Sequence, residues 1–310
     1  MVRRLRLEPP KRRGRPYVYT WPVILACFVV MVNYRLTGFR SLHRFLKSHP
    51  GIAQACGLGR KVPSDRTFSR RFQKLDGVLL QATAQLLRRL TSRKVLRWAL
   101  MVIDGTPLVA RGRRPKGKTA DPRTRDKEAA WGFSTVKDWF WGYKLHVLVA
   151  VKKVILPVAW VVTRANRHEI TQLLRVVRQA MVLAGKRLRI RDVAGDMGYD
   201  SAGHYLTLAE WRIRLTTFIN RRRGGPLTLL QRQRKRYART TRGRWLMKRR
   251  SDVERFFSQP KEIFLFDPLP VVGEATVRTY VSLVLVSYLI GVAYNGLAHR
   301  PLRALKSLVA

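Results

Sequence analysis

The sequence is poor in cysteine and in long apolar runs. Its two cysteines, Cys27 and Cys56, have no C-x-x-C spacing, which excludes a disulfide framework and a cysteine zinc site and fits a reducing interior. The apolar stretches 21–33 and 280–294 fall short of the roughly 20 residues that a membrane span needs. We therefore expect both stretches to be buried core helices and expect no membrane association.

The N-terminal end lacks the apolar run of a secretory signal. Its first sixteen residues carry seven Lys or Arg together with Pro9 and Pro10, so we interpret residues 1–16 as a basic, flexible arm. No internal repeat is visible, and no Ser–His or Cys–His pairing suggests a nucleophilic side chain. These absences direct attention to the charged residues.

Acidic residues are scarce and basic residues abundant. There are 18 Asp and Glu against 63 Lys and Arg, giving a net charge of +45. Such a chain repels itself unless a polyanion neutralises it, and nucleic acid gains affinity with every phosphate that is neutralised. A membrane surface and ribosomal RNA remain open alternatives, because charge alone does not choose among these partners.

Residues 17–95 read as a helical N-terminal domain for DNA binding or dimerisation. Within it, a helix over 65–76 is expected to begin at Ser64 or Asp65 as its N-cap. Phe68, Phe72 and Leu75 share one face of this helix, and the rest of its surface is basic, including Arg66, Arg70 and Arg71. These three arginines either enter a DNA groove or form a solvated face of an ordinary bundle helix.

From residue 96 the pattern changes to short apolar runs separated by helical segments. The expected elements are strands over 98–106, 141–151, 155–163, 188–196 and 214–220, with helices over about 166–184, 200–211 and 250–262. Asn166 and Glu169 look like a capping pair for the first of these helices. Residues 221–250 are dominated by Arg and Lys. The order predicts an α/β fold, a mixed sheet flanked by helices over 96–310.

Three acids in this region are candidates for catalysis. Asp104 closes the first strand, Asp196 closes a later strand, and Glu254 lies on the last helix. Carboxylates that converge repel one another unless cations lie between them, and hard ions such as Mg²⁺ prefer oxygen ligands. The alternatives are local: Asp196 could cap a helix, and Glu254 could pair with Arg250 or Lys261.

Five ordered motifs resemble the bacterial insertion-sequence DDE transposases. They are DGT at 104–106, GYKLH at 142–146, TRANRHE at 163–169, GDMGYDS at 195–201 and the run from Arg250 to Lys261. In that last run, Arg250, Glu254 and Lys261 keep two of the three spacings of the family's Tyr-Arg-Glu-Lys signature. The segment 62–75 also looks like the family's helical leader.

The resemblance implies an RNase H-like catalytic domain. In such a domain Asp104, Asp196 and Glu254 would bind two Mg²⁺ ions, for which Mn²⁺ can substitute. It implies cleavage at terminal inverted repeats and strand transfer to target DNA by a homodimer assembled on double-stranded DNA. Arg250 and Lys261 would grip phosphates near the cut, and Lys144 would be a further phosphate contact. The expected location is the bacterial cytoplasm, in association with the nucleoid.

Two residues depart from the signature. Met247 stands where the family has Tyr, and Pro260 precedes Lys261 and is expected to kink the helix. At about 100° per residue, Arg250, Glu254 and Lys261 would otherwise share one helix face. A catalytically inactive, repurposed transposase that binds DNA is therefore the alternative function, and a membrane-associated basic protein is a third.

Overall fold

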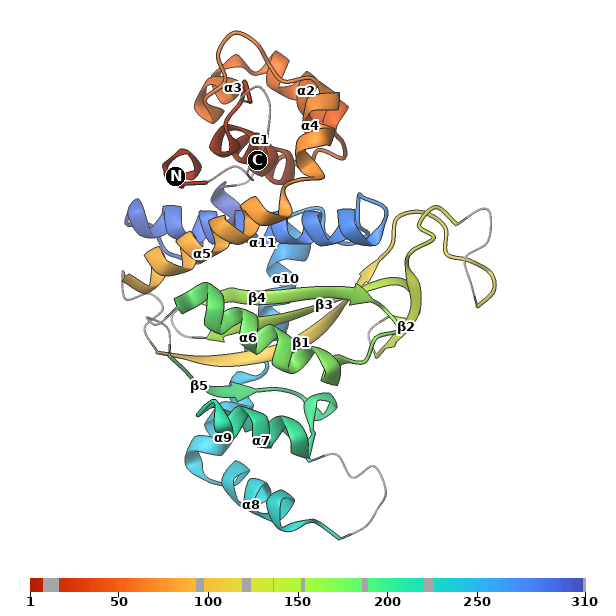
Figure 1. Ribbon diagram of the computed structural model, residues 1–310, viewed down its shortest axis with the longest axis vertical. Helices are drawn as coiled ribbons and strands as arrows, with labels where there is room; N and C mark the ends of the chain where they lie inside the picture. The colour runs from red at the N-terminus through yellow and green to blue at the C-terminus, as the bar shows by residue number, and fades with distance from the viewer. Residues whose placement is uncertain are drawn as a thin grey trace. The chain divides into compact units, whose positions relative to one another are not determined.

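The computed structural model describes residues 1–7, 17–92, 98–118, 124–135, 137–151, 154–185, 189–219 and 226–308 (Figure 1). The chain forms two compact units. The helical unit contains residues 1–86, 109–128 and 260–310, and the sheet unit contains residues 87–108 and 129–259. The C-terminal residues thus join the N-terminal helices in one unit, whereas the sequence suggested a single division near residue 95. Residues 8–16 of the expected arm lie outside the described residues.

The helical unit is built on apolar helices from both ends of the chain. Its elements are η1 (Val2–Arg4), α1 (Trp21–Asn33), α2 (Phe39–Ser48), α3 (Pro50–Cys56), α4 (Asp65–Phe72), α5 (Asp76–Ser92), which runs on into the sheet unit, α11 (Glu274–Leu297) and η5 (Lys306–Leu308). α1 packs against α11, and the ring of Phe28 contacts Phe39, Phe68 and Phe72. Ser64 caps α4 by accepting a hydrogen bond from the Thr67 amide, as predicted.

Both apolar stretches of the sequence are core helices of this unit. α1 buries nine of its 13 residues. α11 is long and apolar enough to cross a membrane by length and composition, and 72% of its most apolar window is buried within the protein. Burial of this kind is expected of a core helix, because a membrane span exposes its apolar side chains to lipid.

The sheet unit contains a six-stranded mixed sheet with the order β2-β3-β1-β5-β6, in which β4 also pairs with β3. The strands are β1 (Trp98–Val109), β2 (Ala130–Ser134), β3 (Asp138–Val151), β4 (Ile155–Arg164), β5 (Arg189–Ala194) and β6 (Arg214–Thr216). β1, β5 and β6 are parallel, and β3 is antiparallel to β2 and β4. This is the RNase H-like arrangement that the sequence predicts.

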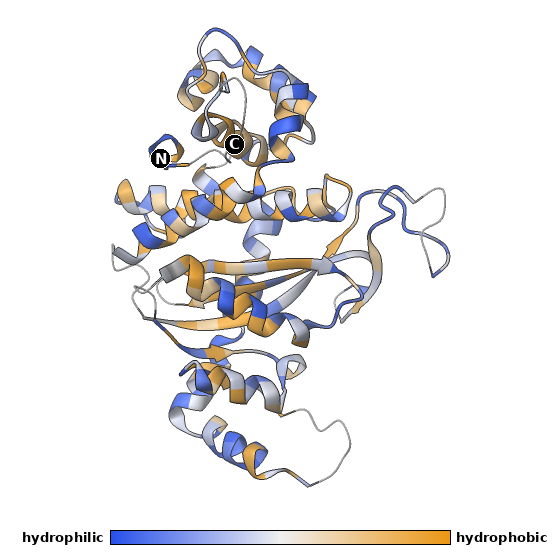
Figure 2. Cartoon of the chain, viewed as in Figure 1, coloured by the Kyte–Doolittle hydropathy of each residue, from blue (hydrophilic) through white to orange (hydrophobic). Residues whose placement is uncertain are grey.

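Helices cover the strands of this sheet. They are η2 (Glu169–Gln172), α6 (Leu173–Ala184), η4 (Met197–Tyr199), α7 (Ala202–Glu210), α8 (Leu229–Ala238), α9 (Thr241–Arg249) and α10 (Asp252–Ile263), the last of which continues into the helical unit. α6 packs on β3 and β4, whereas α7 packs on β6 and α9 on β5 and β6. Figure 2 shows the contrast between the apolar central strands and the hydrophilic α8.

Candidate metal centre

The strand register brings Asp104 and Asp196 together. β1 and β5 are parallel, and their last registered pair is Val102 with Ala194. Asp104 and Asp196 each follow that pair by two residues. Asp104 does not close its strand, as the sequence suggested, because β1 continues to Val109, whereas Asp196 lies just beyond the end of β5. Because side chains alternate with a period of two along a strand, both acids are also expected on the same face. Two acids 92 positions apart in the sequence thereby become neighbours.

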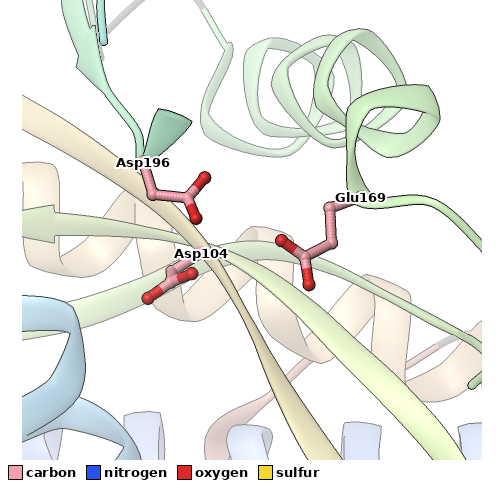
Figure 3. A group of neighbouring side chains, drawn as sticks. All are labelled: Asp104, Glu169 and Asp196. Carbon is pink, nitrogen blue, oxygen red and sulfur yellow. The ribbon is translucent and has the colours of Figure 1, made fainter. Parts of the chain in front are cut away.

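Glu169 is the third carboxylate of this cluster. It begins η2, shortly after β4 ends at Arg164. One carboxylate oxygen from each of Asp104, Glu169 and Asp196 can be chosen so that all three lie within 4.8 Å of one another. Figure 3 shows the three side chains converging on a shared space from different elements. We call these three residues the carboxylate cluster.

Two glycines make room for the cluster. A Cβ atom at Gly105 would lie 3.1 Å from Oε1 of Glu169, and one at Gly198 would lie 3.0 Å from Oδ1 of Asp196. The same residues supply amide donors, because Gly105 N–H donates to Asp104 Oδ1 and Gly198 N–H donates to Asp196 Oδ1, both at 2.8 Å. The glycines of the DGT and GDMGYDS motifs therefore hold two carboxylates in place and leave space for the third.

The cluster has more negative charge than its surroundings neutralise. The pKa of Asp104 is raised to about 7, first of all by burial and also by Asp196 and Glu169, against the opposing effects of the Gly105 amide and Arg250. Burial also raises the pKa of Glu169, while Lys144 lowers it through an ion pair of 3.4 Å between Nζ and Oε1. A low-dielectric site that crowds carboxylates in this way favours a bound cation.

Tyr199 adds a buried hydroxyl beside the cluster. Its side chain is fully buried, and its hydroxyl has no hydrogen-bond partner among the described residues. Burial raises the pKa of this phenol well above its usual value, and all three carboxylates of the cluster add to the rise. An unpaired buried donor close to three carboxylates, all of them oxygen ligands, fits a centre for a hard divalent cation with its bound water.

The sequence that contains this site matches a known family. The transposase DDE domain family aligns with residues 99–290, more than half of the chain, and the match includes every residue of the carboxylate cluster. This chain belongs to the transposase DDE domain family. A search of curated proteins finds no match.

Solved transposase structures are similar to this transposase only remotely. The piggyBac transposase synaptic complex with hairpin DNA has 9% identity and a TM-score of 0.46, covering 96% of this chain and 72% of that chain. The Drosophila P element transposase strand transfer complex has 12% identity and a TM-score of 0.32, covering 93% and 62%. The Mos1 mariner paired end complex with Mn has 12% identity and a TM-score of 0.25, covering 89% and 79%.

Glu254, the third acid expected for the transposase, is not in the carboxylate cluster. It lies exposed in the first turn of α10. Arg250 is close enough to Asp104 to lower the pKa of that acid. The helix expected over 250–262 does not include Arg250. That residue instead caps the C-terminal end of α9. Glu254 and Lys261 do share α10, which continues through Pro260.

The remaining predicted DNA contacts lie in different environments. Lys144, on β3, is mostly buried and pairs with Glu169. Lys261 belongs to the helical unit, as do Arg66 and Arg70, which are exposed on α4. Arg71 is 4% exposed, and its guanidinium lies 3.8 Å from the ring centre of Tyr17 and 3.7 Å from that of Trp21. In this position Arg71 could reach DNA only if the aromatic stack opened.

Sequence reasoning missed Glu169 as a site residue. The sequence suggested a capping pair of Asn166 and Glu169, but the N-cap of η2 is His168 and makes no side-chain capping bond. A usable signal was present, because Glu169 is an acid that soon follows a buried strand, as Asp196 does. Asp196 also caps a helix, which was the alternative that the sequence left open. It is the N-cap of η4 and at the same time a member of the cluster.

Proposed function

We propose that this transposase cuts DNA at the terminal inverted repeats of an insertion sequence and joins the freed ends to target DNA, with divalent cations held at the carboxylate cluster. The proposal rests on one observation above all: the β1–β5 register places Asp104 and Asp196 side by side, with Glu169 completing a set of converging oxygens. Two Mg²⁺ ions, or Mn²⁺ in their place, suit such ligands.

Asp104, Asp196 and Glu169 would hold the cations, and we propose that Glu254 joins them when DNA is bound. The chemistry that such cations supply is activation of the attacking oxygen and stabilisation of the leaving oxygen in phosphoryl transfer. Glu254 keeps the spacing to Arg250 and Lys261 that the family signature requires, and its exposed side chain is unconstrained by burial. The four acids would thus divide into three preformed ligands and one that DNA recruits.

The chain's own cations and hydroxyl have separate roles in this proposal. Arg250 lies near Asp104 and can meet a phosphate entering the centre, because guanidinium groups bind phosphate oxygens in a bidentate manner. Lys144 holds Glu169 in position through their ion pair. The Tyr199 hydroxyl stays protonated, since its pKa is raised well above the usual value, and it can donate to a carboxylate or to a bound water.

The test uses purified protein and labelled duplex carrying the DNA that flanks its own gene. Wild type is compared with Asp104→Asn, Glu169→Gln and Glu254→Gln in Mg²⁺, in Mn²⁺ and in EDTA. We expect nicks at a defined end that require the metal and disappear with Asp104→Asn and Glu254→Gln. Glu169→Gln is expected to weaken metal affinity by at least about 10- to 100-fold, because that loss is usual even for residues that only support a metal ligand.

Met247, in place of the signature's Tyr, supports the alternative of a repurposed, inactive transposase. That protein would bind DNA in a salt-sensitive manner without cutting it in any metal, and wild type and variants would behave alike. Sedimentation of the protein with a pair of DNA ends tests the further proposal that it acts as a homodimer on DNA. Its place of action is proposed to be the bacterial cytoplasm, at the nucleoid.

A further inference from the structure

An arginine-lined groove lies in the sheet unit, apart from the carboxylate cluster. It has a volume of about 610 Å³, and its charged lining residues are Arg191, Asp192, Arg212, Arg214 and Arg242. They come from β5, from the turn after α7, from β6 and from the first turn of α9. Four cations against one acid give the lining a net charge of +3.

Two of these arginines are fixed by Asp192. This acid is 5% exposed and is paired in register with Arg214 across β5 and β6. Its carboxylate lies 2.5 Å from Nη2 of Arg242 and 3.9 Å from Nη1 of Arg214. Arg214 also donates to the Tyr237 hydroxyl at 2.9 Å and lies over that ring, 4.5 Å from its centre. These contacts already hold both guanidinium groups in place, so binding an anion does not cost the side-chain entropy of ordering them.

Arg212 exceeds what Asp192 requires. The Arg212 side chain is exposed and has no hydrogen bond or ion pair within the described residues, and Arg191 is exposed at the same groove. A structural ion pair needs one cation for each buried acid. Arginines gathered beyond that number repel one another, and a bound anion relieves the repulsion. The excess therefore points to an anionic ligand.

The groove continues into a longer basic surface. Residues 229–249, which form α8 and α9, contain nine Lys or Arg and no acid. Arg232, Lys235, Arg236 and Arg239 are exposed along it. A small anion needs one pocket, whereas a polyanion uses a row of cations. The extent of the basic surface therefore favours a nucleic-acid backbone over free phosphate.

The distance from the groove to the carboxylate cluster follows from the strand. Asp192 and Asp196 are four residues apart on β5 and its extension, which corresponds to roughly 13 Å at about 3.3 Å per residue. DNA rises about 3.4 Å per nucleotide along its helix axis, and successive phosphates of one strand are roughly twice as far apart in space. A strand whose reacting phosphate sits at the cluster would therefore place a phosphate about two to four nucleotides away at the groove.

We infer that the arginine groove binds the DNA backbone about two to four nucleotides from the position of cleavage and so fixes the strand in register with the carboxylate cluster. This inference rests on the proposed function for the location of the cut. Binding itself requires no metal, because the arginines alone supply the contacts. Backbone contacts of this kind position a strand without reading its sequence.

The experiment measures binding of labelled duplex in EDTA over a range of salt concentrations. Wild type is compared with Arg212→Gln and with Arg212→Gln/Arg242→Gln, in which Arg214 still pairs with Asp192. Arg175→Gln is the matched control, because Arg175 is exposed on α6 of the same unit. We expect the slope of log K against log salt to fall by about 1 for each groove arginine lost. Arg175→Gln should keep the wild-type slope.

A second arm locates the contact. A single neutral methylphosphonate is placed in turn at each position about two to four nucleotides from the cleavage position, and one of these substitutions should weaken binding by wild type but not by the double variant. An unchanged slope of log K against log salt in the double variant would overturn the inference. Inorganic phosphate provides a second check. If phosphate stabilises wild type but not the double variant, while both bind DNA with the same slope, the groove binds a small anion and the inference is also overturned. Cleavage in Mg²⁺ is measured separately. If the wild type binds DNA through the groove but does not cut it, the proposed function is refuted and the binding role of the groove is retained.

Discussion

The ionised form of Asp104 depends on a bound cation for its stability. It is surrounded by two other carboxylates and partly buried, and Arg250 offsets only part of that charge. When no cation is bound, the Asp104 carboxyl holds its proton more tightly in the folded protein than in the unfolded chain. The residue is therefore costly to stability when ionised, as is common where a site is built for binding rather than for packing.

Asp104→Asn is expected to raise the melting temperature in EDTA near neutral pH. The pKa of Asp104 is about 7 in the folded protein against an ordinary value of 3.8, so the folded state binds more protons between these limits. The free energy of unfolding of wild type therefore falls as pH rises through this window. The Asn variant cannot ionise and escapes that loss.

Thermal melting at about pH 5 and about pH 8 checks this, because a group with a folded pKa near 7 titrates between them. The gain should be large at the higher pH and small at the lower one. Glu210→Gln, a change at an exposed acid on α7, is the control. Equal differences at both pH values would contradict the expectation, as would stabilisation of Asp104→Asn by Mg²⁺ to the same degree as wild type.

Gly105→Ala is expected to lower metal-dependent cleavage while DNA binding in EDTA stays near wild type. The new Cβ would lie 3.1 Å from Oε1 of Glu169, so the carboxylate must shift slightly from its place in the cluster. Gly77→Ala, at a helical position with nothing within 4 Å, is the control. The metal concentration at half-maximal cleavage should rise for Gly105→Ala, and an unaltered value would show that Glu169 is not a ligand.

Residues whose role is set by local sequence could be predicted, and those set by tertiary contacts could not. Asp104 and Asp196 each come directly after a run of apolar strand residues and were found from the sequence. Glu169 was interpreted as a helix cap because its neighbours fit that pattern equally well. Arg71 follows the basic pattern of α4, yet its burial depends on Tyr17 and Trp21, which lie some fifty positions earlier.

At the scale of elements, segments with a strong apolar periodicity were predicted correctly, whereas the helices in highly charged segments were not. The expected hairpin over 141–151 and 155–163 corresponds to β3 and β4, with β3 beginning earlier at Asp138. The short β2 was not predicted. Residues 221–250 carried no apolar periodicity, yet α8 and α9 form there. Their helical signals are caps, a capping box of Thr228 with Gln231 and the Thr240 N-cap.

Gly243→Ala is expected to separate α9 from α8. A Cβ at Gly243 would lie 2.2 Å from the backbone oxygen of Tyr237 and 2.8 Å from Cα of Ala238, and neither backbone atom can turn aside. We expect a loss of about 1–3 kcal/mol, the usual cost of overpacking. Because Tyr237 and Arg242 both support the arginine groove, the slope of DNA binding against salt should also fall.

Hydrogen exchange of the α8 amides measures the loss directly, because local opening of a helix removes its protection. Gly203→Ala is the matched control, since Gly203 is also helical and a Cβ there would meet only Ser201 Oγ at 3.9 Å. Faster exchange in both variants would attribute the effect to glycine replacement in general. Unchanged protection in Gly243→Ala would mean that the two helices adjust without cost.

At the scale of the whole molecule, the charge of +45 dominates. Contacts to phosphates release counterions wherever they form, so much of the affinity for DNA is expected to be independent of sequence. Specificity must then come from the difference between the transposon end and other DNA. The net charge predicted a nucleic-acid partner but carries no information about which ends are recognised.

Preference for the protein's own DNA ends is expected to emerge only as salt increases. A protein with 6–10 phosphate contacts loses on the order of 10³–10⁵ in affinity between about 50 and about 200 mM salt. Competition between a duplex with the flanking ends and a scrambled duplex, measured across this range, checks the prediction. The preferred duplex should compete better at the upper limit, and equal competition throughout would argue against recognition of defined ends.

The partnership of α1 with α11 has a consequence for how the protein is made. α1 ends at Asn33 and α11 begins at Glu274, so α1 leaves the ribosome long before its partner is translated. At about 5–20 residues per second, the apolar face of α1 waits on the order of ten seconds to a minute. Chains that terminate early never bury that face, so prematurely ended products are expected to be cleared by proteolysis before they act on DNA.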